Sequence, residues 1–222
     1  MLGTDFEPDL SETLRYLGYR GQELSDEMLG RIKAMSELCQ RVSHPDYTYG
    51  VFELDGTRLV GTDLTLEGES IKRHLDGAEK CVLMAATLGH ACDREALRLE
   101  ARSLADAVAF NAASVSLIEA VSDRCQREIG ARFKGEGLHI NGRFSPGYGD
   151  LPLSTQAPLL RLLRAEERLG ITLTDGYLML PRKSVTAVIG LFRTEKTGET
   201  RGCAVCGMRE FCEYRKGGER CG

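Results

Sequence analysis

The stretch that most constrains the fold runs from residue 91 to residue 133, where the spacing of apolar residues predicts the longest helix of the chain, interrupted at most by a short break. The segment ADAVAFNAASVS within it is rich in small residues, which let a neighbouring element approach closely. We therefore expect this helix to run through the core. The residues that trace its apolar face are Leu104, Val108, Ala112, Val115, Ile118, Val121, Cys125 and Ile129.

The remaining patterns alternate between strands and helices without the regular spacing of parallel β-α-β units. KCVLMAATLG at 80–89 is an apolar run typical of a buried strand, and Asp55-Gly56 predicts a tight hairpin turn within 47–61. Further helices are predicted at 11–42 (broken near 18–21, with Ser25 starting the second piece), at about 70–75, and at about 156–169, capped by Ser154 or Thr155. Further strands are predicted at 171–173, 177–180 and 183–192.

These elements predict an α+β fold, with a mostly antiparallel or mixed twisted sheet packed with helices. The composition changes near residue 194, where TEKTGETRG lacks apolar residues. We therefore divide the chain into a domain of residues 1–193 and a linker with a cysteine-rich tail at 194–222.

Composition argues against two classes of partner. The formal net charge of −4 and the absence of Trp disfavour a nucleic-acid partner, which usually requires a basic stripe or stacking aromatics. No run approaches the roughly 18 apolar residues of a membrane helix, and the acidic N-terminus does not resemble a signal peptide. We expect a cytoplasmic protein.

The segment RFSPGYGDLP at 143–152 has the composition of a ligand-binding loop. Pro146 and Pro152 stiffen it, and Gly147 lets a ligand approach the backbone. Arg143 offers a planar fork for a carboxylate, and Tyr148 offers an aromatic face and a hydroxyl. The set suits a small molecule with a carboxylate and a flat ring. The alternative is a rigid turn beside an ordinary surface arginine.

The longer context resembles the activation domain of cobalamin-dependent methionine synthase, in its shorter stand-alone form. RFSPGY is followed by a proline, a helix, the step GITLT and the strand MLPRKSV, which is the order of motifs in that family. The resemblance is strong over 142–192 and compatible over 90–135, and LRYLGYRGQ at 14–22 looks like the stand-alone members.

The resemblance implies a function. Members bind S-adenosylmethionine and present its methyl group to a cobalamin that has oxidised to cob(II)alamin, which is remethylated with one electron from a donor. No D-x-H-x-x-G cobalamin signature occurs here, so we expect the cobalamin on a separate methionine synthase subunit or a related corrinoid protein. The chain would be the reactivation subunit in that methyltransferase system.

The resemblance also implies site residues. Arg143 would bind the methionyl carboxylate, and Ser145, Gly147 and Tyr148 would line the ligand. Glu119 would face the amino group. Asp5 is a weaker match to an N-terminal aspartate of the family. The tyrosine that the family carries after the last strand is missing here, so that contact is lost or replaced.

Lys183 and Ser184 are candidates only because they are close to the expected site in sequence. His90 and His139 are expected to be structural histidines.

The last twenty residues carry a cysteine cluster of spacing C-x2-C-x5-C-x8-C. Such thiolates bind an iron–sulfur cluster, which we favour because the implied reaction needs an electron, or alternatively zinc. Lone thiols, a non-enzymatic metal-ordered adaptor and an iron–sulfur electron carrier remain as alternatives. The expected metal ligands are Cys203, Cys206, Cys212 and Cys221.

Overall fold

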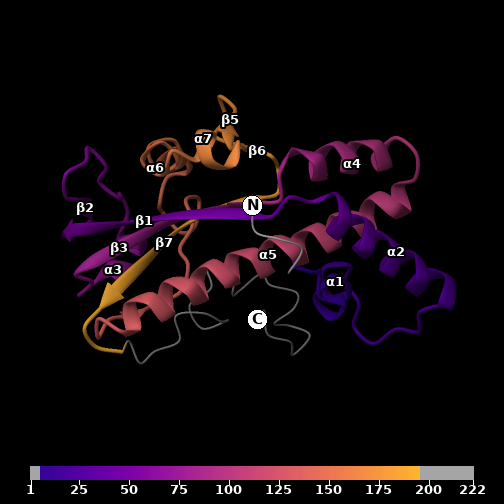
Figure 1. Cartoon of the computed structure of the whole chain (residues 1–222), viewed down its shortest axis with the longest axis horizontal. Helices are drawn as coiled ribbons and strands as arrows, with labels where there is room; N and C mark the ends of the chain where they lie inside the picture. Colours follow the sequence, from indigo (N-terminus) through magenta and orange to yellow (C-terminus); the bar gives the residue numbers. More distant parts are fainter. Residues whose placement is uncertain (1–5, 196–222) are drawn as a thin grey trace. The chain divides into compact units, whose positions relative to one another are not determined.

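The computed structural model describes residues 6–195. It has a five-stranded sheet of order β2-β1-β3-β7-β4 and a separate β5–β6 hairpin, together with α-helices and one 3₁₀ turn (Figure 1). Contacts group residues 6–195 into two compact units, the first within 6–50, 84–127 and 156–186, the second within 51–83, 128–155 and 187–195. The strands are β1 (Asp46–Asp55), β2 (Arg58–Leu59), β3 (Lys80–Thr87), β4 (His139–Ile140), β5 (Thr172–Leu173), β6 (Met179–Leu180) and β7 (Ser184–Phe192).

Backbone hydrogen bonds show the direction of the strands. The N–H of Leu88, at the end of β3, bonds to the carbonyl of Lys183 before β7 at 2.9 Å, and the N–H of Glu79, before β3, bonds to Leu191 near the end of β7 at 3.0 Å. The two strands are therefore antiparallel. β1 pairs antiparallel with β2 across a turn in which Gly56 has φ +62°, and β4 pairs antiparallel with β7. The predicted α+β class and the predicted hairpin are confirmed.

The first unit contains α1 (Leu10–Tyr16), α2 (Asp26–Val42), α4 (His90–Glu100) and most of α5 (Leu104–Lys134). Ser25 caps α2 by accepting a hydrogen bond from the N–H of Met28 at 3.2 Å, as predicted. The predicted long helix is α4 and α5 separated by a short break.

The apolar face of α5 is buried only in part. Its start differs from the prediction, because Leu104 is 75% exposed and Val108 is 51% exposed. Its buried residues include Ala109, Phe110, Ala112, Ala113, Leu117, Ile118, Val121, Cys125 and Ile129. The core therefore covers the helix from about Ala109 onward.

By length and composition alone α5 could cross a membrane, contrary to the expectation that no such segment exists. Alanines account for the difference, since they raise the mean hydropathy without forming an unbroken run of large apolar residues. Ser114 and Ser122 are buried and bond to the carbonyls of Phe110 and Ile118 at 2.7 and 2.8 Å. The helix has the packing of a core helix.

The helix predicted at 156–169 is two helices, α6 (Gln156–Leu163) and α7 (Ala165–Leu169). Arg164 between them has φ +52°, a left-handed conformation that interrupts the helix. The two predicted cap residues, Ser154 and Thr155, belong to a 3₁₀ turn (Leu153–Thr155) that leads directly into α6. Gly170 ends α7 at φ +67°, as predicted.

The second unit contains β2, α3 (Glu69–Leu75), β4, the 142–152 loop and most of β7. Its core is aliphatic and includes Leu59, Leu66, Ile71, Leu75, Leu138, Leu151 and Ile189. Of the expected tail at 194–222, only residues 194 and 195 are described. Its four cysteines lie outside the described residues.

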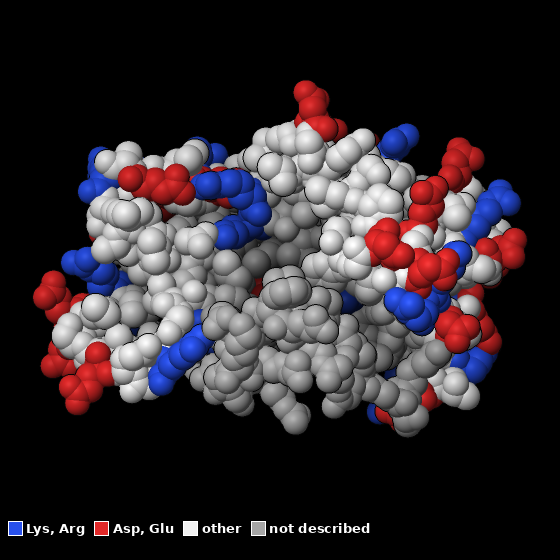
Figure 2. Space-filling model, turned by 180° about the vertical axis from the view of Figure 1, so that it is seen from behind, with Lys and Arg blue, Asp and Glu red and all other residues white. Residues whose placement is uncertain are grey.

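Charged side chains of both signs are interspersed over the described part of the face in Figure 2. No extended basic stripe is visible among the described residues on that face.

Candidate functional site

The 142–152 loop leaves the sheet from a fixed starting point. Phe144 pairs with Val188 of β7 through two backbone hydrogen bonds, of 2.9 and 2.8 Å. Just before it, the buried Asn141 donates from Nδ2 to the carbonyl of His74 at 2.8 Å and accepts the N–H of Gly190 on Oδ1 at 2.8 Å. One amide therefore ties the loop entrance to α3 and to β7.

The segment Ser145–Tyr148 forms a tight turn. The N–H of Tyr148 bonds to the carbonyl of Ser145 at 3.0 Å, with Pro146 second and Gly147 third at φ +90°. Proline followed by a positive-φ glycine is the signature of a type II turn. The N–H of Gly147 also bonds to the carbonyl of Leu151 at 2.9 Å, so the turn is closed onto the far side of the loop.

The end of the loop is tied to the start of α3. The Asp150 carboxylate accepts the N–H of Glu69 at 2.7 Å and that of Ser70 at 2.9 Å. These are unpaired donors of the first helical turn, and Gly68 offers no side chain to cap them. The N–H groups of Ser70 and Glu69 hold the pKa of the Asp150 carboxyl below its usual value.

The approach of the loop to α3 requires glycine at two positions. A Cβ on Gly149 (φ +53°) would lie 2.5 Å from Ser70 Oγ, and one on Gly68 (φ +124°) would lie 2.6 Å from Asp150 Oδ1. A Cβ on Gly147 would meet only Leu153 Cδ1, at 3.4 Å. Gly149 and Gly68 are therefore required by packing, and Gly147 by its turn conformation.

Three aromatic rings, two from the loop and one from α3, lie next to one another. Phe144 lies between His74 of α3, at a centroid distance of 5.0 Å, and Tyr148, at 6.0 Å and edge-on. Burial lowers the pKa of His74 to about 4, against a weaker opposing effect of the Val188 and Gly142 carbonyls. Its Nε2 makes no hydrogen bond of normal geometry with any described residue. Tyr148 is 59% exposed, so an aromatic face is available at the surface.

Four of the five predicted ligand-binding residues lie on this loop. Arg143 and Ser145 are half-buried, whereas Gly147 and Tyr148 are exposed. Glu119 lies on the part of α5 that belongs to the first unit. There it is half-buried and adds to the effect of burial in raising the pKa of Tyr16. Asp5 lies outside the described residues.

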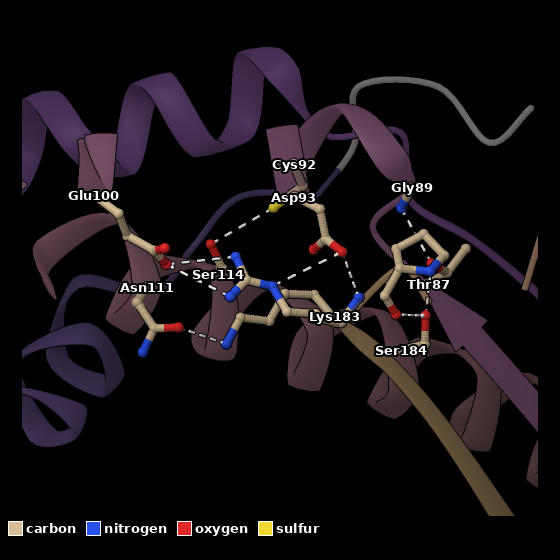
Figure 3. A network of polar contacts seen from close by, with 11 residues as sticks. Thr87, Gly89, Cys92, Asp93, Glu100, Asn111, Ser114, Lys183 and Ser184 are labelled. Carbon is tan, nitrogen blue, oxygen red and sulfur yellow. Dashed lines mark hydrogen bonds and ion pairs between the residues drawn. The ribbon is translucent and has the colours of Figure 1, made fainter. Parts of the chain in front are cut away.

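The other polar candidates lie elsewhere. Lys183 donates to Asn111 Oδ1 at 2.7 Å, and Ser184 Oγ lies 2.9 Å from Thr87 Oγ1, in a polar network of the first unit (Figure 3). His90 Nε2 is 3.0 Å from the carbonyl of Gly170, and His139 lies in β4 opposite Phe192 of β7.

The metal ligands predicted in the tail lie outside the described residues. Within residues 6–195 no cluster of three or more potential metal ligands occurs. Cys39, Cys81, Cys92 and Cys125 are buried free thiols.

Sequence reasoning missed three residues that hold the loop: His74, Asn141 and Asp150. Asp150 lies two residues after the turn, and aspartate is a common helix-capping residue, but its partners are 80 and 81 positions away in sequence. No local pattern marks His74 or Asn141.

Comparison with known proteins gives two matches and one negative result. The sequence model of the family described as "Vitamin B12 dependent methionine synthase, activation domain" matches residues 78–199. A solved structure titled "Crystal Structure of the MetH Reactivation Domain bound to AdoHcy" shares the fold, with a TM-score of 0.62 and 16% sequence identity over 96% of this chain and 82% of that chain. No curated protein matches the chain.

Proposed function

The chain belongs to the family of vitamin B12-dependent methionine synthase activation domains, and from this membership we propose that it binds S-adenosylmethionine and serves, in the cytoplasm, as the reactivation subunit of a separate cobalamin-dependent methionine synthase. The cobalamin carried by that partner supplies the chemistry: cob(II)alamin, one electron and the methyl group of the sulfonium give methylcobalamin and S-adenosylhomocysteine.

The preformed 142–152 loop is the observation that carries the proposal. It is held by β7 at one end and by α3 at the other, and its middle is a closed turn. A loop that is already ordered loses little conformational entropy when a ligand binds. The bound S-adenosylhomocysteine of the structural neighbour, which is the demethylated product, agrees with this ligand class.

Each loop residue has a defined task in this proposal. The guanidinium of Arg143 forms a charge-assisted fork with the methionyl carboxylate. The backbone at Ser145 and Gly147 accepts close approach of the ligand, and the exposed ring of Tyr148 packs against it. Glu119 is proposed as the partner of the amino group. No general base is required, because transfer of a methyl group to a reduced cobalt releases no proton; the protein aligns the methyl group and excludes water.

Calorimetric titration of the full chain with S-adenosylmethionine tests the binding step. We expect saturable one-site binding, weakened about ten- to hundredfold by Arg143→Ala, because a hydrogen bond between charged groups contributes roughly 1.5–3 kcal/mol. Arg193→Ala is the matched control, since this arginine belongs to the same unit and pairs with Glu79 at 2.9 Å. Equal affinity of wild type and Arg143→Ala would remove Arg143 from the site.

The partner is tested separately. The full chain, the cobalamin-bearing subunit and a one-electron reductant should together convert cob(II)alamin to methylcobalamin, followed by its visible absorbance. If the chain alone does not bind the ligand, a titration repeated with the cobalamin protein distinguishes a site completed on docking from an adaptor that has lost the ligand.

For the tail we propose an iron–sulfur cluster held by Cys203, Cys206, Cys212 and Cys221, with zinc as the alternative. Support comes from the four-thiol spacing and from the electron that the reaction consumes. Iron and acid-labile sulfide in anaerobically purified protein, lost together in Cys203→Ser/Cys206→Ser, would agree with the cluster. Stoichiometric zinc without sulfide would replace it with a structural metal.

A further inference from the structure

Two buried cysteines of the first unit meet on one serine. Cys39 Sγ of α2 lies 3.5 Å from Ser114 Oγ of α5, and Cys92 Sγ of α4 lies 3.6 Å from the same oxygen. The hydroxyl of Ser114 donates to the carbonyl of Phe110 at 2.7 Å, so its oxygen accepts hydrogen bonds from the two cysteines while they are protonated. Both sulfurs therefore lie within hydrogen-bond distance of Ser114 Oγ, although the two cysteines are 53 positions apart in sequence.

One of the two sulfurs lines a cavity. The cavity measures about 60 Å³, and its lining includes Cys92, Asp93, Asn111, Ser114, Arg182 and Lys183. Cys39 does not line it. A water molecule takes up roughly 30 Å³ in the liquid, so a molecule of two oxygen atoms fits. Of these lining residues, Asn111 and Arg182 are exposed.

The hydrogen bonds around Cys92 lower the pKa of its thiol and so favour the thiolate. The hydrogen bond from Cys39 lowers the pKa of Cys92 to about 7, against the opposing effects of burial and of Asp93. The same contact and burial raise the pKa of Cys39, which stays protonated. Lys183 lies on the cavity wall and Asp93 is engaged by the N–H of Arg182 at 2.6 Å.

We propose that Cys92 is a peroxide-reactive thiol and that Cys39 resolves its oxidised form into a Cys39–Cys92 disulfide. Four observations carry this proposal: the shared serine, the cavity that reaches only Cys92, the ammonium group of Lys183 in that cavity, and the packing of α2 against α4.

The chemistry is a two-electron oxidation of the protein by hydrogen peroxide. The Cys92 thiolate attacks one peroxide oxygen, an S–O bond forms and the O–O bond breaks. The leaving hydroxide takes a proton from the Lys183 ammonium and departs as water. The Cys39 thiol then attacks the sulfenic sulfur, and its proton and the sulfenic hydroxyl leave as a second water.

The four buried cysteines of the described chain give a test that needs no substitution. Full-length protein is exposed to a small excess of hydrogen peroxide at pH 7.4, and each cysteine is then scored by differential alkylation after denaturation, with peptide mass spectrometry. We expect Cys92 to oxidise at least about a hundredfold faster than Cys81, because the thiolate is the reactive species. Burial raises the pKa of Cys81 to about 12.

The identity of the product distinguishes a resolving role for Cys39 from simple oxidation. A non-reducing digest should contain a Cys39–Cys92 cross-linked peptide, and Cys125 should stay reduced. In Cys39→Ser, Cys92 should pass to the sulfinic acid, which is detected by its mass. Oxidation of Cys92 no faster than that of Cys81, or pairing of Cys92 with a tail cysteine in place of Cys39, would overturn the proposal.

The role of Lys183 has its own control. Lys183→Met should slow the oxidation of Cys92, because it removes the positive charge and the proton donor from the cavity. Lys33→Met removes an exposed positive charge from α2, outside the cavity lining, and should leave the rate unchanged. Equal rates in the two variants would show that Lys183 does not assist the thiol.

Discussion

The close approach of the loop to α3 makes Gly149→Ala the most informative single substitution. The added methyl group would lie 2.5 Å from Ser70 Oγ and 2.8 Å from Ser70 Cβ. Rotation of the hydroxyl relieves the first contact but not the second, because Cβ is fixed to the helix. Either α3 or the loop must therefore move.

The expected loss has two parts. A side chain at φ +53° costs about 1–2 kcal/mol by its conformation alone. Forcing a methyl group into a filled contact costs about 1–3 kcal/mol more. We expect Gly149→Ala to lower the free energy of unfolding by about 2–5 kcal/mol, measured by denaturant titration.

A matched variant separates the two parts. Gly137 belongs to the same unit and has φ +71°, but a Cβ there meets nothing within 4 Å. Gly137→Ala should therefore show only the conformational part, about 1–2 kcal/mol.

A double-mutant cycle then tests the contact itself. Ser70→Gly removes both clashing atoms, so adding it to Gly149→Ala should recover about 1–3 kcal/mol relative to additivity. The reasoning fails if Gly149→Ala and Gly137→Ala lose equal stability, or if Ser70→Gly and Gly149→Ala add without coupling.

Two further predictions concern the anchors of the loop. Burial lowers the pKa of His74 to about 4, whereas an unfolded histidine titrates near 6.5. Because the unfolded state binds the proton first, stability should fall as the pH drops from about 6.5 through 4, by about 3 kcal/mol in total. Unfolding of His74→Phe should lack this part of the pH dependence, and an unchanged pH profile would contradict the assignment. Asn141→Leu leaves the N–H of Gly190 and the carbonyl of His74 unpaired, and should cost about 2–4 kcal/mol. Hydrogen exchange at the Gly190 amide should rise, and full protection there would show that Asn141 is not the anchor.

Elements with a local signal could be predicted from the sequence. The hairpin at Gly56, the cap at Ser25 and the S-P-G-Y turn each follow from residues that favour one backbone conformation. The order of the loop and strand motifs likewise indicated the family that the comparison shows. Local chemistry was sufficient wherever the determining atoms lie within a few residues of one another.

Other features depend on contacts between distant residues. Arg164 interrupts a run of good helix formers in which nothing local marks a left-handed residue. Asp150 caps a helix that starts 81 residues before it, and Cys39, Cys92 and Ser114 come from three separate helices. The exposure of Leu104 and Val108 depends on where the core ends, which the periodicity of one helix does not define.

The loop contains one residue that the fold does not explain. Pro146, Gly147 and Gly149 are accounted for by the turn and by the contact with α3, and Asp150 by the cap. Tyr148 contacts Phe144 only edge-on and leaves 59% of its surface exposed. The ring therefore buries little apolar surface and contributes little to the stability of the fold. Residues that break the local rules without a structural gain are expected at functional sites.

Tyr148→Ala should therefore leave the free energy of unfolding within about 1 kcal/mol of wild type while weakening the binding of S-adenosylmethionine. Tyr148→Phe separates the ring from the hydroxyl, because a ligand that packs on the ring keeps its affinity in this variant. A large loss of stability with unchanged affinity in Tyr148→Ala would assign the ring to the fold instead.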